Sequence, residues 1–536
     1  MPDDTGRMGK WMVLAIILAA SVPYIFTVSD YFLQDDFGVV QIFARRPWTM
    51  FPKWFVMPWT EDIWGYTPDE LRPFVALTYQ LTGKWNPSRP ELHHIFNVAL
   101  HVANALLVFS IARLAIGLSA LAAGFAGVIF AVLPGQVESV VWITGRVDSM
   151  PTFFYLATFL SYVDWRQHRR WSAYAGAMSL FFVALFSKQN TITMVATLAV
   201  YDLLCLTAEQ RGPLYRAVVA WSPFAVMTAG FLILRRLVFG HSLRAGQHAG
   251  SEIDAVTTML GHHLRRTITG QLAPFTNADL ALVVLLIVAL ILVLVRSAPP
   301  LRTKFVRGIS VFGLIWIAIG AAPVALAGYE SPRHIYLASA GWAFILALTL
   351  EGAVMLARLR SARPVAMTVA TLVVAFYMVR LVPVLRVWHT FASISEAGTV
   401  RVQQEAADAV PGTLLMVGLP LKSWEWSAPF MLSPPFAPVE LARRVHMVTP
   451  WRLHCCGTEN WDVYTRAHLR AWIAASPRPP IIALRYSPGT GVLSRVTDKE
   501  LPELAEIVPV LLQTSTPQTL DGVITDILEK MVAGRR

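Results

Sequence analysis

Long apolar runs constrain this chain more than any other feature of its sequence. Residues 280–295 contain no charged or polar side chain, and a helix needs roughly 20 mostly apolar residues to span a bilayer. The whole chain of 536 residues is 55% hydrophobic and only 15% charged, whereas a soluble domain carries about 25% charge. Water cannot solvate so much apolar surface. The sequence therefore predicts a polytopic membrane protein that is all-α in its membrane part.

These runs predict about eleven transmembrane helices. They lie near residues 11–28, 93–115, 117–134, 149–163, 171–187, 190–206, 217–239, 280–295, 308–327, 335–357 and 365–387. The first run contains Ala19-Ala20-Ser21, a triplet that resembles a signal-peptide cleavage site. We favour an uncleaved helix there, because the run is long and the chain goes on to cross the membrane again.

The basic residues set the predicted orientation. They gather in the segments before the first run and after the fourth, sixth, eighth and tenth runs, as Arg7, Lys10, Arg166, Arg169, Arg170, Arg211, Arg216, Arg296, Arg302, Lys304, Arg307, Arg358, Arg360 and Arg363. The positive-inside rule makes that side cytoplasmic. The net charge of +11 is thus explained by topology, and no stripe of basic and aromatic residues indicates nucleic-acid binding. The loops 29–92, 135–148, 187–190, 240–279 and 328–334 are then expected outside.

The last part of the chain loses the apolar runs. Residues 413–419 and 481–486 read as strands bounded by Pro and Gly, and 500–512 as a short helix. We therefore divide the chain into a membrane domain, 1–390, with a long first outer loop, and a small α/β or α+β outer domain, 391–536. Of the three cysteines, Cys205 is expected to pack, while Cys455 and Cys456 form either a vicinal disulfide or two thiols.

An acidic pair follows the first predicted helix. Asp35 and Asp36 are adjacent in the long outer loop. Two neighbouring carboxylates raise one another's pKa and so provide a proton acceptor. A solvated helix cap or a topogenic charge pair is the alternative interpretation.

Further ionisable residues stand in the predicted outer loops. Such residues at membrane depth are candidates for a functional site, and they are Arg72, His93, His94, Glu138, Arg146, Asp148, Lys188, Glu330, Arg333 and His334. Cations can hold a phosphate and stabilise it as a leaving group, so this set suits chemistry on an anionic lipid headgroup. The alternatives are an interfacial helix start for the two adjacent histidines and a structural ion pair between Arg146 and Asp148.

Several of these segments resemble one known family, the transmembrane and tetratricopeptide-repeat O-mannosyltransferases. Residues 71–109 are similar to the family's "YRPL" and "FHLVN.LLH..N" patterns, and LPGQVESVVWITGRVDSM (133–150) to "HP.HTEAV…GRAD". LFSKQNTIT (185–193) resembles "LLSKE.GIT", and SPRHIYLAS (331–339) resembles "ERYLYLPS". Asp35-Asp36 stands where the wider GT-C superfamily carries its first-loop acidic motif. The resemblance covers roughly residues 10–390.

The departures from the family pattern limit what carries over. Leu133 and Gln136 replace two of the family's histidines, Gln189 replaces an acidic residue, and Pro332 replaces a glutamate. No tetratricopeptide array follows the membrane part. The lipid-linked donor therefore carries over better than mannose or a protein acceptor does.

The resemblance implies a GT-C-like fold with its active site at the outer membrane interface. A polyprenyl-phosphate-linked sugar would be the donor, and transfer to a hydroxyl-bearing acceptor would invert the anomeric carbon. Asp35 would be the general base, with Asp36 aiding it or exchanging roles. The donor phosphate would be gripped by Arg72, Lys188 and Arg333. The pocket would be shaped by Glu138, Arg146, Asp148, His93, His94, Glu330 and His334.

Cofactor, location and rival functions complete the expectations. We expect no metal, although Asp35, Asp36 and Glu138 offer oxygen ligands for a divalent ion. The basic, envelope-like character points to a bacterial inner membrane with the active site and C-terminal domain on the periplasmic side. The rivals are a transporter or flippase of lipid-linked glycans, which would show two related halves or broken helices, an envelope polysaccharide polymerase or ligase, and a non-catalytic scaffold.

Overall fold

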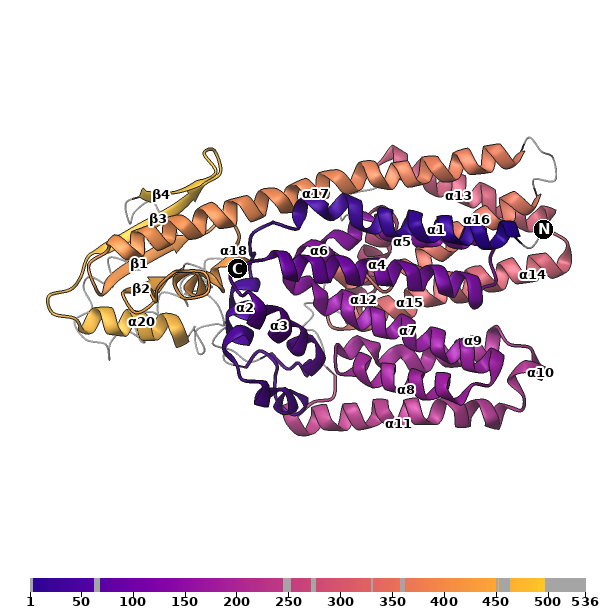
Figure 1. Cartoon of the computed structure of the whole chain (residues 1–536), viewed down its shortest axis with the longest axis horizontal. Helices are drawn as coiled ribbons and strands as arrows, with labels where there is room; N and C mark the ends of the chain where they lie inside the picture. Colours follow the sequence, from indigo (N-terminus) through magenta and orange to yellow (C-terminus); the bar gives the residue numbers. More distant parts are fainter. Residues whose placement is uncertain are drawn as a thin grey trace.

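The computed structural model describes residues 3–61, 68–243, 252–270, 276–328, 331–356, 362–449, 452 and 463–496. A bundle of long helices forms one half of the molecule, and a small sheet lies beyond one end of it (Figure 1). The N-terminus lies at the opposite end of the bundle. The predicted class, a helical membrane protein with a small C-terminal α/β domain, agrees with this architecture.

The bundle is built from helices that run along its long axis. They are α1 (Asp3–Ser21), α4 (Glu91–Leu114), α5 (Ala120–Val132), α7 (Arg146–His168), α8 (Trp171–Leu185), α9 (Met194–Leu204), α11 (Leu214–Phe239), α12 (Glu252–Thr269), α13 (Asn277–Arg296), α14 (Pro299–Gly308), α15 (Trp316–Leu326), α16 (Ser339–Leu356) and α17 (Ala362–Asp408). A π-helical segment, Ile309–Ile315, joins α14 to α15. A short helix, α10 (Ala208–Arg211), turns the chain at the end near the N-terminus (Figure 1).

Seven helices of the described residues are long and apolar enough to cross a membrane, or eight if a bent pair counts as one span. The prediction of about eleven is therefore not confirmed. The physical reasons are local: α8 has only 15 residues and α9 only 11, and charged residues lie near both ends of α7. The first run, Met8–Thr27, is one of the seven.

The bend after α5 brings residues of the candidate site back toward the bundle. Pro134 ends α5, because proline has no N–H to continue a helix. The chain then turns by 54° into η3 (Pro134–Gln136) and α6 (Val137–Val141). A second short turn, η4 (Ile143–Gly145), leads into α7. A Cβ on Gly145 would collide with the Glu138 carbonyl oxygen, so only glycine fits where the two turns cross.

The first outer loop folds into its own elements at the end of the bundle that faces the sheet. They are α2 (Asp36–Arg45), η2 (Trp48–Phe55) and α3 (Pro73–Trp85). Their apolar side chains share one core with the C-terminal domain, where Phe436 packs edge-on against Phe32 and Phe37 at centroid distances of 5.0 and 4.7 Å. The loop and the C-terminal domain therefore lie on the same face (Figure 1).

The C-terminal sheet has four strands in the order β2-β1-β3-β4. They are β1 (Thr413–Gly418), β2 (Val445–Val448), β3 (Ile481–Ser487) and β4 (Val492–Val496), with α20 (Val463–Ala474) packed beside β2. Strand β1 pairs in parallel with β2 and β3, and β3 pairs antiparallel with β4. The strands predicted at 413–419 and 481–486 are confirmed. The helix predicted at 500–512 and the pair Cys455-Cys456 lie outside the described residues.

One helix joins the membrane part to the sheet. Helix α17 has 47 residues and, at 1.5 Å per residue, extends about 70 Å. It passes the expected domain boundary at 390 without a break, and Arg495 on β4 pairs with Glu405 at 2.6 Å between Nη2 and Oε2. The sheet is thus attached through a continuous helix instead of a linker.

A buried ion pair at the opposite end of the bundle offers a test of the packing. Arg166 on α7 donates from its guanidinium to Asp202 on α9, and Tyr162 and Trp221 donate to the same carboxylate at 2.6 and 2.9 Å. Removing one partner of such a pair costs about 3–5 kcal/mol. We expect Asp202→Ala to lower the thermal unfolding midpoint of the detergent-purified protein by several degrees. Asp164→Ala, which removes a carboxylate paired only with exposed partners, should change the midpoint little; equal shifts would contradict this packing.

Candidate active site

The two acids of the pair have different surroundings. Asp36 is 1% exposed, and one of its carboxylate oxygens accepts from the Thr144 N–H at 2.9 Å and from the Thr144 hydroxyl at 2.6 Å. Its other oxygen accepts from the Leu33 N–H at 3.0 Å. Asp35 is only half-buried, and to the described residues its carboxylate makes no hydrogen bond or ion pair. Asp36 is therefore fixed, whereas Asp35 is available to a ligand.

Burial, more than mutual repulsion, perturbs both acids. It raises the pKa of Asp35 to about 6, against the opposing effect of Arg333. It also raises the pKa of Asp36 to about 7, although the hydrogen bonds from Thr144 and Leu33 lower it. The charge of Asp35 is the smallest contribution to the raised pKa of Asp36. Desolvation is therefore the main cause of the raised pKa values, and the role of the pair as a proton acceptor stays a prediction.

The turn before the pair has an uncommon backbone conformation. Gln34 has φ 49°, in the left-handed region that non-glycine residues rarely adopt. This turn directs the chain into α2, whose first residue is Asp36. Such conformations persist where the surrounding structure enforces them, often at functional sites.

A lattice of alternating charges, formed by Asp148, Lys188, Arg333 and Glu138, faces the acid pair. Asp148, at the start of α7, pairs with Lys188 and, at 3.4 Å between Oδ2 and Nε, with Arg333. Arg333 also pairs with Glu138 at 2.6 Å between Nη1 and Oε1, and its guanidinium lies 4.7 Å from the centre of the Trp142 ring. Trp142 in turn donates to the Leu33 carbonyl at 3.2 Å, two residues before Asp35. Segments from four separate loops thus meet here.

Arg72 adds a cation from the first outer loop. Its Nη2 pairs with Glu70 Oε1 at 2.8 Å, and its guanidinium lies 5.6 Å from the Trp59 ring centre. Burial lowers the pKa of Lys188, and the charges of Arg72 and Arg333 lower it further while Asp148 raises it. The three predicted phosphate-binding cations are therefore near neighbours, and each has a carboxylate partner.

Arg146 has a different environment from the one expected. It is fully buried, and it donates to Asn97 Oδ1 at 3.0 Å and to the His93 carbonyl at 3.1 Å. The rings of Tyr79 and Phe96 lie 4.4 and 4.7 Å from its guanidinium carbon. The structural Arg146–Asp148 ion pair is not formed. Arg146 instead supports the floor of the site through neutral partners.

The predicted histidines are buried near the site. His93 Nδ1 lies 2.9 Å from the Thr82 hydroxyl, and His94 Nε2 lies 2.9 Å from the Asp30 carbonyl oxygen. Both rings therefore join α4 to the first outer loop and do not line an open surface. His334 is 6% exposed, beside Arg333. Glu330 lies outside the described residues.

Sequence reasoning missed four residues that position the site. Thr144 holds Asp36, Glu70 holds Arg72, Trp142 lies under Arg333, and Asn97 holds Arg146. Of these, Thr144 and Trp142 fall within the motif that was singled out at 133–150, so a closer reading of its polar and aromatic positions would have found them. Glu70 and Asn97 gave no signal beyond their place in the loop and helix.

The candidate metal ligands do not converge. Within the described ranges, no group of three His, Cys, Asp or Glu side chains could hold a metal ion. Glu138 is bound to Arg333 and Ser331, and the oxygens of Asp36 accept from Thr144 and Leu33. The residues Asp35, Asp36 and Glu138 therefore do not fit a shared divalent ion.

Known O-mannosyltransferases are similar in sequence to part of this chain. The chain is 29% identical to protein O-mannosyl-transferase Tmtc1 of Drosophila melanogaster over 196 residues, which are 34% of this chain and 22% of that protein. It is also 29% identical to protein O-mannosyl-transferase TMTC3 of Homo sapiens over 168 residues, 28% of this chain and 18% of that protein. The resemblance to O-mannosyltransferases is confirmed. The chain spans about a fifth of the length of these relatives.

Two further comparisons complete the findings. No protein family model matches the chain. Among solved structures, the oligosaccharyltransferase AglB from Archaeoglobus fulgidus, in complex with an inhibitory peptide and a dolichol-phosphate, superposes with a TM-score of 0.44 at 10% identity, over 91% of this chain and 74% of that one.

The hydrogen bonds of Asp36 give a prediction that separates positioning from bulk packing. Thr144→Val removes the hydroxyl that donates to the carboxylate and should raise the pKa of Asp36 further. The pKa of Asp36 in the folded protein lies above its unfolded value of about 3.9. The free energy of unfolding therefore falls as the pH rises through the folded pKa. A still higher pKa in the variant extends this fall to higher pH.

We expect the thermal unfolding midpoint of Thr144→Val to fall more at pH 8 than at pH 6, relative to the unmodified protein. Thr144→Ser keeps the donor and should show a much smaller pH-dependent difference. A shift of Thr144→Val that is the same at both pH values would mean that the hydroxyl does not stabilise the ionised carboxylate.

Proposed function

We propose that this protein is an inverting glycosyltransferase that moves a sugar from a polyprenyl-phosphate-linked donor to a hydroxyl acceptor on a protein, a lipid or an envelope glycan. The single observation that carries the proposal is an unpaired, half-buried carboxylate, Asp35, beside a lattice of buried and half-buried cations at one end of a membrane helix bundle. The similarity to O-mannosyltransferases supports the reaction class.

Asp35 is proposed as the general base. Its pKa, raised to about 6 by burial, leaves it ionised at neutral pH yet basic enough to take a proton in the transition state. In the reaction, the acceptor oxygen forms a bond to the anomeric carbon while its proton passes to Asp35. The bond from that carbon to the phosphate oxygen breaks, and its electron pair leaves with polyprenyl phosphate. Attack opposite the leaving group inverts the anomeric centre.

Asp36 is proposed as a positioning residue. Its three hydrogen bonds tie the start of α2 to Thr144 and Leu33, and these fix the backbone that presents Asp35. Exchange of roles between the two acids is disfavoured by this geometry, because Asp36 is 1% exposed.

Arg333, Lys188 and Arg72 are proposed to bind the donor phosphate. Each is held by a carboxylate, and Arg333 and Lys188 retain unused donors. Within the described chain, the Nη2 of Arg333 and two of the three ammonium donors of Lys188 make no hydrogen bond. A phosphate that binds these donors would not need to break the Asp148 and Glu138 contacts. The lattice is thus preorganised, and preorganised cations stabilise a departing anion without reorganisation cost.

The remaining parts of the proposal concern placement. The membrane domain, 1–390, would carry the reaction in a GT-C-like arrangement at the outer, periplasmic interface of a bacterial inner membrane. The C-terminal domain, 391–536, would cover the acceptor, since it shares a core with the first outer loop beside the acid pair.

Removing the base gives the central prediction for activity. With membranes or lipid extracts that contain polyprenyl-phosphate sugars, we expect Asp35→Asn to reduce release of polyprenyl phosphate at least about 100-fold, the scale of general-base catalysis. Asp164→Asn, at a half-buried carboxylate remote from the site, is the matched control. Full activity of Asp35→Asn at normal expression would remove Asp35 from the mechanism, and no turnover by the unmodified protein with any such donor would favour a transporter or scaffold.

The raised pKa of Asp35 also predicts the pH dependence of transfer. Only the ionised carboxylate accepts a proton, so kcat/KM should fall about tenfold for each pH unit below about 6. Above pH 7 this group should impose no further dependence. The profile is measured with a polyprenyl-phosphate-linked donor at pH 4.5 to 8, and an acidic limb centred near pH 4 would mean that Asp35 is not desolvated in the working enzyme.

A further inference from the structure

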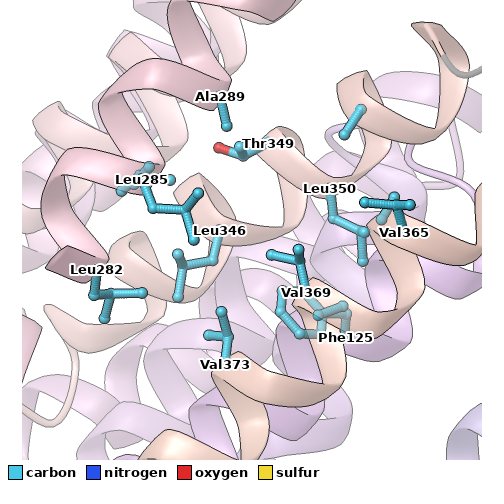
Figure 2. Close-up of a pocket in the computed structure, with 14 residues that line it drawn as sticks. Phe125, Leu282, Leu285, Ala289, Leu346, Thr349, Leu350, Val365, Val369 and Val373 are labelled. Carbon is cyan, nitrogen blue, oxygen red and sulfur yellow. The ribbon is translucent and has the colours of Figure 1, made fainter. Parts of the chain in front are cut away.

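A large apolar cavity lies within the membrane bundle, away from the acid pair. It has a volume of about 300 Å³ and is formed by α5, α13, α16 and α17. Of its 14 lining residues, only Thr349 carries a polar side-chain atom, and that hydroxyl donates to the Ile345 carbonyl at 2.8 Å. Figure 2 shows leucine and valine side chains from three helices directed into this space. The lining therefore suits a hydrocarbon chain and offers nothing to a polar ligand.

The cavity opens to the lipid near the bilayer face opposite the acid pair. Val365, at its rim, is 63% exposed and lies in the first turn of α17. Ala353 lies in the last turn of α16, whose first residue, Ser339, follows the loop of Arg333. At 1.5 Å per residue, Ala353 is about 20 Å along α16 from that end. A chain anchored at the acid pair would thus have to cross most of the membrane to fill the cavity.

A cation stands below the cavity on the same helix face. Leu282, Leu285 and Ala289 of α13 line the cavity, and Arg296 follows Ala289 by seven residues, two turns of helix. Arg296 is exposed, and to the described residues it makes no hydrogen bond or ion pair. The carboxylate of Glu351 on α16 accepts from the N–H of Ser119, the residue before α5, at 3.3 Å, and Glu351 is not among the lining residues. A lipid whose chain fills the cavity would place its headgroup at Arg296.

We propose that this cavity binds one acyl chain of an anionic phospholipid from the leaflet opposite the acid pair, with the lipid phosphate paired to Arg296. Basic residues at the ends of membrane helices attract anionic headgroups, and the positive-inside rule predicts that this is the cytoplasmic leaflet. The site would be separate from the donor site, because the donor phosphate is proposed to bind at the other face. The bound lipid would fill the space between α17 and its neighbours, and α17 carries the C-terminal sheet.

Native mass spectrometry of the full-length protein tests this site. The protein is delipidated in detergent and titrated separately with phosphatidylglycerol, phosphatidylethanolamine and undecaprenyl phosphate. We expect one tightly held phosphatidylglycerol. Ala289→Phe, which fills the cavity, should weaken its retention at least about tenfold, and Leu237→Phe on the lipid-facing side of α11, where Leu237 is 79% exposed, should not.

A second variant does not depend on repacking the cavity. Arg296→Gln changes an exposed residue and should weaken the retention of phosphatidylglycerol about fivefold, the scale of one surface basic residue. Arg216→Gln, at the same end of the bundle but on another helix, should have no effect. Equal retention of phosphatidylethanolamine, preferential retention of undecaprenyl phosphate that Ala289→Phe abolishes, or no retained lipid would each overturn the proposal. None of these outcomes bears on the role of Asp35, which the donor-turnover assay measures.

Discussion

The contacts of Asp148 with Lys188 and Arg333 hold the candidate active site together. Asp148 lies in the first turn of α7, Lys188 follows α8, and Arg333 precedes α16, so one carboxylate joins the segments next to three helices. Charges this deeply buried are costly unless they are paired. Once paired, they hold the loops in one arrangement, because moving any one of them would leave another charge buried without a partner.

The same lattice explains why the two adjacent acids differ. Glu138 and Asp148 balance Arg333, whose ring partner Trp142 donates to the backbone beside Asp35. Asp36 is turned inward to Thr144, in the same short segment as Trp142. The segment 133–150, folded back by Pro134 and closed at Gly145, therefore supplies the anchors for Lys188, Arg333 and Asp36.

The sequence located the elements of the fold better than the contacts between them. Apolar runs located most of the helices, and the strands at 413–419 and 481–486 were visible as apolar segments between Pro and Gly. The count of spans failed where helices are short, as in α8 and α9, or carry charges near their ends, as in α7. The hydrogen-bond partners of the site residues could not be predicted, because Asn97 and Thr144 act through contacts with residues remote in sequence and Glu70 carries no motif of its own. Arg146 shows the limit most clearly: a nearby aspartate suggested an ion pair, yet its partners are an amide, a carbonyl and two aromatic rings.

The two ends of the bundle differ in polarity. Among the described residues, paired charges and the unpaired carboxylate of Asp35 lie at one end, while the other has an apolar cavity above an exposed arginine. This division requires the first outer loop, the end of α11 and the sheet to share one face of the bilayer, and α10 and α14 to lie at the other.

Labelling with a membrane-impermeant thiol reagent tests that arrangement most directly, in a background with Cys205, Cys455 and Cys456 replaced by Ser. Single cysteines at Ser88, His241 and Thr490 should all react from outside intact cells. Cysteines at Gln210 and Thr303 should react only after permeabilisation. If Ser88 and His241 reacted from opposite sides, Asp69 in the first outer loop could not pair with Arg235 and His241 at the end of α11, and the arrangement would be contradicted.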